Sequence, residues 1–366
     1  MKQLTTRLVL AIVAAILASC ATVTPPPDRA APAASGAHGK AADATAQKDA
    51  DLPRMELEPS ILYDILVGEL AGQRGQMNVA TITLSRAAQR TRDPRLAERA
   101  TLAGLYAKRY GEALQSGELW VELRPEDAEA REALATVYLE LGRTQDARAQ
   151  FDRILAIEEG RGNLEQAYMR AAAALSRQPN RDMGMEVMKS LVQMHPDSPA
   201  AHIAMAHLAV RAGNLDEALT AANSALVLKP EWEAAAVFKA RILISQKDAQ
   251  AADAFFQNYL KQYPDATNLR MNYARQLIDQ KQWERAHEQF KRVIAAQPED
   301  ADAVYAVGLL SLQTNRLDEA EKYLTQALTL RPDNDQARLY LGQVAEQRKR
   351  YAEAIRWYEQ VTASEF

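Results

Sequence analysis

The chain has 366 residues, with 44 lysines and arginines against 48 aspartates and glutamates and a formal net charge of −4. This balance excludes a protein that binds nucleic acid through a general basic excess, because neutralising phosphates requires clustered positive charge. Hydrophobic residues make up 48% of the chain and aromatic residues only 6%, a composition that favours helices. The length allows two globular domains or one long array of repeats.

The first nineteen residues have the composition of an export signal. Lys2 and Arg7 form a basic start, and an uninterrupted apolar run follows over residues 8–18. This run is too short for a membrane-spanning helix, which needs about 20 apolar residues. We therefore interpret residues 1–19 as a signal peptide.

The single cysteine, Cys20, directly follows this run. It has no second cysteine for a disulfide, a redox pair or a zinc site. The tetrapeptide LASC, residues 17–20, resembles the lipobox of bacterial lipoproteins, in which the chain is cut before the cysteine and the cysteine is acylated. The resemblance implies a covalent lipid on Cys20, such as palmitate, and no other cofactor. The alternative is an ordinary signal peptide with a chance cysteine.

The resemblance also implies a place for the protein. More than one acyl chain gives stable anchoring, since each buried methylene contributes about 0.8 kcal/mol of membrane affinity. Ala21, rather than aspartate, follows the cysteine. By the sorting rule of enterobacterial lipoproteins, this implies attachment to the outer membrane, facing the periplasm.

Residues 20–58 have the composition of a disordered tether. From Ala21 to Met55 there is no aromatic residue and almost no large aliphatic one, so the segment cannot bury enough apolar surface to offset chain entropy. Three consecutive prolines, residues 25–27, stiffen its start. A coil of about 35 residues reaches roughly 30–35 Å. The sequence thus predicts a folded body held away from the membrane.

Proline recurs every 34 residues in the second half of the chain, at Pro196, Pro230, Pro264, Pro298 and Pro332. This is the period of the tetratricopeptide repeat, a pair of antiparallel helices closed by a turn. Segments between the prolines, such as "VGLLSLQTNRLDEAEKYLTQALTLRP", resemble this family closely. The resemblance implies an all-α fold: a right-handed solenoid of about nine helix pairs over residues 59–366.

Small residues recur where two helices of a repeat must approach each other. The eighth positions hold Gly68, Ala103, Ala135, Ala172, Ala206, Ala240, Ala274, Gly308 and Gly342. The twentieth positions hold Ala80, Ala113, Ala147, Gly184, Ala218, Ala252, Ala286, Ala320 and Ala354. Bulky residues that fill the helix interface occupy the seats between them, at Leu84, Phe151, Met188, Phe256, Phe290, Leu324 and Tyr358.

The array has two irregularities. We interpret residues 108–111 as a shortened turn and residues 158–165 as an insertion at which the superhelix can bend. The ninth repeat ends at Phe366 without a polar capping helix and would expose Ile355, Trp357 and Val361. We expect that the chain is cut short after Phe366 or that a partner covers this end.

The sequence contains no recognisable catalytic or metal-binding motif. HExxH, GxSxG and P-loop patterns are all missing. His202 and His207 are five residues apart, about 140° around a helix, so they cannot share a metal ion. Acidic pairs recur at the start of second helices, where they favour the helix dipole. We predict no catalytic residue, no metal site and no enzymatic activity of this chain.

First helices of stacked repeats line one face of a solenoid, so equivalent positions form stripes. The fifth positions hold Ile203, Val237, Met271, Tyr305 and Leu339. The ninth positions hold His207, Arg241 and Arg275, with Arg211 and Asn272 close by. An apolar stripe beside a basic one suits an extended peptide or an amphipathic helix, with guanidinium groups for carboxylates.

These stripes have an alternative interpretation, in which the apolar side chains pack between neighbouring helices and the arginines are only solvated. The ninth positions also lack the asparagine of the carboxylate clamp in chaperone-binding tetratricopeptide domains. The pattern therefore does not indicate a strict reader of carboxyl-terminal carboxylates.

The first repeats, including "LYDILVGELAGQRGQMNVA" and "TRDPRLAERATLAGLYAKRYGEAL", resemble the tetratricopeptide outer-membrane lipoproteins that act as adaptors of carboxyl-terminal processing proteases. The resemblance implies a scaffold that binds and activates a periplasmic serine protease and helps present its substrates, such as peptidoglycan-cleaving enzymes. Its partners would be proteins, with membrane contact through the lipid alone and no nucleic acid.

Three other functions fit the same combination of lipobox, tether and repeats. One is a lipoprotein for pilus or outer-membrane assembly, another is an accessory of a peptidoglycan enzyme, and the third is a passive spacer between membrane and cell wall. The repeat pattern leaves open the identity of the partner, the face that binds it and the oligomeric state.

Overall fold

The computed structural model describes residues 52–53, 55–56, 58–178 and 180–361. Within these ranges the chain forms eighteen α-helices and no β-strand, which confirms the prediction of an all-α fold. The described residues divide into two compact parts, which we call the N-terminal unit (up to residue 230) and the C-terminal unit (from residue 231). The predicted signal peptide, Cys20 and most of the predicted tether lie outside the described residues.

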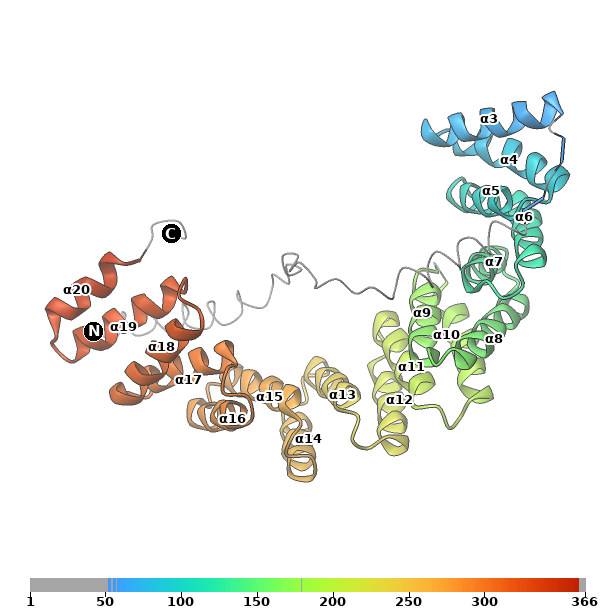
Figure 1. Ribbon diagram of the computed structural model, residues 1–366. Coiled ribbons are helices and arrows are strands. Elements are labelled where there is room, and N and C mark those ends of the chain that lie inside the picture. Colours follow the sequence, from blue (N-terminus) through green and yellow to red (C-terminus); the bar gives the residue numbers. More distant parts are fainter. Residues whose placement is uncertain (1–51, 54, 57, 179, 362–366) are drawn as a thin grey trace. The chain divides into compact units, whose positions relative to one another are not determined.

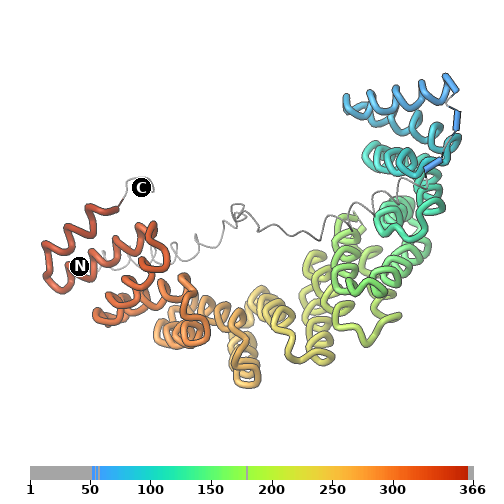
Figure 2. Tube along the Cα trace, viewed as in Figure 1, coloured from blue at the N-terminus to red at the C-terminus, as the bar shows by residue number. Residues whose placement is uncertain are grey.

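The helices follow one another as antiparallel hairpins (Figures 1 and 2). The N-terminal unit contains α3 (Pro59–Gln73), α4 (Met77–Thr91), α5 (Pro94–Tyr106), α6 (Tyr110–Leu123), α7 (Ala128–Glu140), α8 (Thr144–Gly160), α9 (Leu164–Ser176), α10 (Arg181–Met194), α11 (Pro199–Ala212) and α12 (Leu215–Leu228). The C-terminal unit contains α13 (Glu233–Ser245), α14 (Ala249–Gln262), α15 (Thr267–Asp279), α16 (Trp283–Ala296), α17 (Ala301–Gln313), α18 (Leu317–Leu330), α19 (Asp335–Gln347) and α20 (Tyr351–Glu359). Odd-numbered helices are the first helices of the repeats.

The turn inside each hairpin is short and has a recurring backbone conformation. A residue with left-handed φ ends the first helix in eight repeats, at Gly75, Lys108, Gly142, Gly213, Lys247, Lys281, Asn315 and Lys349. This conformation lets a following N–H reach back to the helix, as when Arg143 N donates to Tyr138 O over 2.8 Å. The turn geometry therefore fixes the register between the two helices of a repeat.

The predicted small residues are buried at the contacts between helices. Every residue named above for the eighth and twentieth positions is buried. The bulky residues of the helix interface are buried too, except Tyr358, which is half-buried. A Cβ built on Gly68 would lie 2.6 Å from Leu84 Cγ, nearer than real Cβ atoms approach. Because Gly68 on the first helix has no side chain, there is room for Leu84 on the second helix.

The second repeat departs from the predicted register. Arg109 N donates to Gly104 O just as Arg143 N donates to Tyr138 O, which makes Gly104 and Tyr138 equivalent. The eighth position of this repeat is therefore Thr101, three residues before Gly104. The prediction of Ala103 at that position is wrong, and so is the prediction of a shortened turn at residues 108–111.

Thr101 fits where other repeats have alanine or glycine because the residue that faces it is small. That residue is Gly117 on the second helix, where most other repeats have a bulky side chain. The larger side chain of the pair is thus on the first helix in this repeat. A Cβ on Gly117 would lie 3.4 Å from Thr101 Cγ2 and 3.3 Å from Leu134 Cδ1. The helix spacing is thus kept by the pair of residues together, and neither residue alone follows the pattern.

The insertion at residues 158–165 extends α8, which has 17 residues where α6 and α10 each have 14. Its buried acid, Glu158, accepts hydrogen bonds from Arg161 Nη1 at 2.9 Å and Asn163 Nδ2 at 3.3 Å. The extra residues therefore lie in the helix, and this carboxylate fixes the short link to α9, residues 161–163.

The fourth position of several repeats closes the turn from the preceding repeat. Side chains there reach the carbonyl of the turn proline: Arg131 Nε to Pro125 O at 2.8 Å, His202 Nε2 to Pro196 O at 2.8 Å, Arg270 Nη2 to Pro264 O at 2.8 Å, and Arg338 to Pro332 O. Because these partners satisfy a carbonyl that the helix cannot, we interpret these arginines and His202 as structural.

At the end of the described chain, Ile355 on α20 is 56% exposed, as predicted, whereas Trp357 and Val361 are half-buried. The apolar surface left open by α20 is thus smaller than the sequence suggests.

Candidate partner-binding surface

The predicted apolar stripe lies at equivalent positions of first helices. In the C-terminal unit, Val237 on α13, Met271 on α15, Tyr305 on α17 and Leu339 on α19 are all half-buried. In the N-terminal unit, Ile203 on α11 is only 5% exposed and belongs to the core. The four half-buried residues therefore offer apolar edges to a partner, whereas Ile203 offers almost none.

Tyr305 of the apolar stripe is fixed by a hydrogen bond and by a contact with a second aromatic ring. Its hydroxyl donates to Gln336 Oε1 over 3.1 Å, and its ring centre lies 6.4 Å from that of Tyr340. Burial raises the pKa of the Tyr305 phenol above its usual value of 10. The side chain is thus a neutral, fixed aromatic group at neutral pH.

The basic residues of the C-terminal unit lie one turn after the apolar stripe. Arg241 on α13 is exposed and Arg275 on α15 is half-buried. Among the residues that the structure describes, neither guanidinium makes a hydrogen bond or an ion pair, whereas Arg285 on the neighbouring second helix α16 contacts Asp253 at 2.8 Å. Asn272 Nδ2 donates to Asn268 O over 2.8 Å. The two arginines are thus the available cations of this surface.

Of the predicted polar residues in the N-terminal unit, Arg211 contacts the preceding repeat. Arg211 Nη1 donates to Ser176 Oγ over 3.2 Å, although the Arg211 side chain is exposed. His207 is half-buried on α11. The structure therefore groups Val237, Arg241, Met271, Asn272, Arg275, Tyr305 and Leu339 in one unit and Ile203, His207 and Arg211 in the other.

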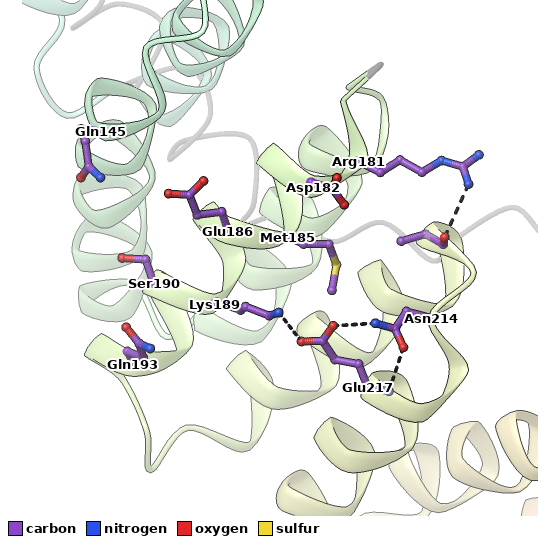
Figure 3. Close-up of a pocket in the computed structure, with 11 residues that line it drawn as sticks. Gln145, Arg181, Asp182, Met185, Glu186, Lys189, Ser190, Gln193, Asn214 and Glu217 are labelled. Atoms are coloured by element: carbon purple, nitrogen blue, oxygen red, sulfur yellow. Dashed lines mark hydrogen bonds and ion pairs between the residues drawn. The ribbon is translucent and has the colours of Figure 1, made fainter.

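A cavity of about 730 Å³ lies on the second-helix side of the N-terminal unit (Figure 3). It is bounded mainly by α8, α10 and the start of α12, with Ala212 at the end of α11, and its lining is Gln145, Arg181, Asp182, Met185, Glu186, Lys189, Ser190, Gln193, Ala212, Asn214 and Glu217. The repeat pattern does not predict this cavity, because the exposed positions that line it carry different residue types from one repeat to the next.

One wall of this cavity is held by an ion pair. Lys189 Nζ lies 2.7 Å from Glu217 Oε1, and Asn214 Nδ2 donates to Glu217 Oε2 over 2.9 Å (Figure 3). Asp182 and Glu186 are exposed on α10, and within the described chain their carboxylates have no hydrogen-bond or ion-pair partner. The charged residues in the lining are therefore three acids and two bases, which leaves a small surplus of negative charge.

Neither a metal site nor a membrane-spanning helix is found within the ranges that the structure describes. No three histidine, cysteine, aspartate or glutamate side chains come together there as metal ligands would. None of the helices there combines the length and the apolar character needed to cross a bilayer.

Family models identify the repeat. Models of the tetratricopeptide repeat match residues 82–163, 184–242, 239–266, 273–335 and 308–365. A curated relative, TPR repeat-containing protein PA4667 of Pseudomonas aeruginosa, is 29% identical over 137 residues, which are 37% of this chain and 23% of that protein. The chain thus matches less than a quarter of the length of that relative.

Several solved structures are also similar to this chain. MamA from Desulfovibrio magneticus RS-1 is 21% identical, covering 44% of this chain and 92% of its own, with a TM-score of 0.39. The TPR domain of P58(IPK) is 16% identical, covering 84% and 93%, with a TM-score of 0.30. Yeast Tom70 is 12% identical, covering 82% and 92%, with a TM-score of 0.37. From the matched repeats, the chain belongs to the tetratricopeptide-repeat family.

Proposed function

We propose that this protein is a lipid-anchored, periplasm-facing adaptor that binds and activates a carboxyl-terminal processing serine protease and helps present its substrates, such as peptidoglycan-cleaving enzymes. The tetratricopeptide array is a scaffold for protein–protein interaction, so the chemistry would come from the bound protease. The observation that carries the proposal is the row of half-buried apolar side chains on the first helices of the C-terminal unit, beside two arginines that have no ion-pair partner among the described residues.

This surface suits an extended segment of a partner protein. Val237, Met271 and Leu339 would contact apolar side chains of that segment, while Tyr305 presents a rigid ring. Arginine pairs with carboxylates through two parallel hydrogen bonds, which gives direction as well as affinity. A segment with alternating apolar and acidic residues therefore matches the surface best.

The location rests on the amino-terminal sequence. Residues 17–20 match a lipobox, and a lipid on Cys20 followed by the tether would hold the repeats in the periplasm, where such proteases act. In this proposal the protein belongs to the outer membrane and contacts it through the lipid alone.

Affinity purification of the full-length protein from crosslinked cell envelopes tests the proposal. We expect a carboxyl-terminal processing protease to be recovered in near-stoichiometric amount. Repeated absence of the protease would overturn the adaptor function, and recovery of a pilus or outer-membrane assembly component in its place would favour the assembly function.

A pair of matched variants tests the surface itself. Arg241→Glu with Arg275→Glu should weaken partner binding by about tenfold or more, because guanidinium–carboxylate attraction becomes repulsion. Lys261→Glu with Arg356→Glu makes the same change in net charge on the exposed faces of α14 and α20 and should leave affinity unchanged. Equal effects of the two pairs, with helix content intact, would show that the stripe is only solvated surface.

A further inference from the structure

The first helix of the array, α3, exposes an apolar face. Leu62, Tyr63, Leu66 and Leu70 are 44%, 62%, 59% and 49% exposed. Leu62 and Tyr63 lie four and three residues before Leu66, and Leu70 lies four residues after it, so all four share one side of the helix. The opposite side packs on α4 (Figure 1), with Ile61 and Gly68 buried. An exposed stripe of large apolar side chains on one helix marks an interaction surface.

The repeat register shows what normally covers this face. Counting from the eighth position, Tyr63, Leu66 and Leu70 are equivalent to Ala303, Ala306 and Leu310 of α17. Those three residues are 0%, 4% and 1% exposed, because the preceding repeat packs on α17 through α16. Helix α3 therefore presents a stacking face, with Tyr63 and Leu66 where α17 has two alanines.

The chain segment that leads to α3 has almost nothing with which to cover this face. From residue 21 to residue 51, Val23 is the single valine, leucine, isoleucine, methionine or aromatic residue. Covering four large side chains requires comparable apolar area from the other side. Between this segment and α3, Leu52 is half-buried and Met55 is itself 44% exposed, so this composition favours an occupant from another molecule.

The α3 face is self-complementary about Leu66. Leu62 and Leu70 lie four residues to either side of it, and Glu58 and Arg74 lie eight residues to either side. Glu58 is the N-cap residue and Arg74 the C-cap residue of the helix. Two antiparallel copies of α3 with a two-fold axis at Leu66, crossing at about 50° so that their rows of every fourth residue align, bring Leu62 opposite Leu70 and Glu58 opposite Arg74 in both halves of the contact.

The charges allow this pairing. Within the described chain, the Arg74 guanidinium has no hydrogen-bond or ion-pair partner. Glu58 contacts Arg90 of its own chain at 2.5 Å, but the Glu58 side chain is 64% exposed and that of Arg90 39% exposed, so this ion pair is weak and the carboxylate can also face a second cation. We propose that α3 is a homodimerisation helix that pairs antiparallel with α3 of a second copy of this chain.

Cysteine crosslinking in intact cells tests the pairing and its register. Leu66→Cys should give a disulfide-linked dimer on mild oxidation, because the two thiols meet at the axis. Leu62→Cys and Leu70→Cys should crosslink to each other when co-expressed, at least fivefold more than either does alone. Val227→Cys, at a 77% exposed position on α12, is the matched control for random collision. All variants keep Cys20, so the unsubstituted chain gives the background.

A charge exchange provides a second measurement. Arg74→Glu should lower the Leu66→Cys dimer yield several-fold, since like charges then meet at both ends of the contact. Adding Glu58→Arg should restore the yield. All these positions are exposed, so the variants should retain the helix content and melting temperature of the parent chain.

Three results would overturn the homodimer: a Leu66→Cys yield no higher than that of Val227→Cys, crosslinking of Leu66→Cys to a different protein, or protection of the Leu66→Cys thiol by lipid without any dimer. The pairing does not depend on which protein the adaptor binds. Recovery of the protease without the crosslink would reject the dimer alone, and the crosslink without the protease would reject the adaptor alone.

Discussion

Gly308 and Leu324 fix the distance between α17 and α18. A Cβ built on Gly308 would lie 2.8 Å from Leu324 Cγ and 3.1 Å from the Leu324 backbone nitrogen. Leu324 is fully buried, so it cannot swing away. The two helices can therefore pack at this distance only because residue 308 has no side chain.

Gly308→Ala should accordingly lower the free energy of unfolding by about 1–3 kcal/mol through overpacking. Gly111→Ala in α6 is the control, because no heavy atom lies within 4 Å of a Cβ there and alanine is a better helix former. Urea unfolding followed by circular dichroism measures both. Equal stability of the two variants would contradict the steric explanation.

Arg270 closes the turn before α15 from a buried position. It is 5% exposed and donates to Pro264 O at 2.8 Å and Gln289 Oε1 at 3.0 Å, while burial, together with the nearby charge of Arg292, lowers its pKa. Arg270→Met keeps much of the apolar stem but leaves two acceptors without their donor. We expect a loss of about 2–3 kcal/mol in unfolding free energy.

Arg292→Met serves as the comparison for Arg270→Met. Arg292 is exposed and forms a surface ion pair with Glu288 of the same helix, so its removal should cost little. The same urea titration separates the two. If both variants lost similar stability, the turn-closing role of Arg270 would be wrong.

His287 should make the C-terminal unit sensitive to acid. The ring is 4% exposed; its Nδ1 accepts from Arg316 Nη1 at 3.2 Å and its Nε2 lies 3.0 Å from Glu319 Oε2. Burial lowers the pKa of His287 below 6.5, and the charges of Arg316 and Lys291 lower it further, although Glu319 opposes them. The folded protein therefore holds the neutral ring, whose Nδ1 has no room for a proton facing Arg316.

The sign of the pH effect follows from this lowered pKa. As the pH falls below 6.5, the unfolded chain takes up a proton at His287 more readily than the folded one, so stability decreases. His287→Gln removes this contribution. We expect unfolding free energies at pH 7.5 and pH 5.5 to differ less in the variant than in the parent chain, and an unchanged difference would refute the assignment.

Cys20 allows a direct test of the proposed anchor. Cys20→Ala removes the acylated thiol, so the protein should move from the membrane fraction to the soluble periplasmic fraction. Its circular dichroism spectrum and melting temperature should match those of the parent chain, because residue 20 lies before the repeats. A variant that stayed with the membranes would refute the lipoprotein interpretation.

Much of the fold could be predicted from the sequence because nearly the same helix contacts recur in every repeat and require the same kinds of residue. The 34-residue spacing of prolines and the small residues at Ala252 or Ala286 reflect helix contacts that recur in every hairpin, and these residues are indeed buried. Thr101 and Gly117 escaped the pattern because the contact limits the combined size of two facing residues. A single position examined alone does not reveal such an exchange.

The candidate surface was only partly predictable for a different reason. The repeat pattern does not distinguish Ile203, which is buried, from Met271, which is half-buried at the same position of another repeat. That difference depends on neighbouring side chains from other helices. The cavity beside Lys189 and Glu217 likewise depends on how three helices diverge, which no local pattern encodes.

The sequence by itself determined the all-α repeat architecture, since periodic small and apolar residues allow one kind of helix packing. It also determined that Cys20 has no cysteine partner in the chain. Only the tertiary structure decided that Arg270 closes a turn and that, within the part of the chain it describes, the guanidinium groups of Arg241 and Arg275 have no partner and the leucines of α3 are uncovered. Exposure and pairing depend on residues that are distant in sequence and meet only when the helices stack.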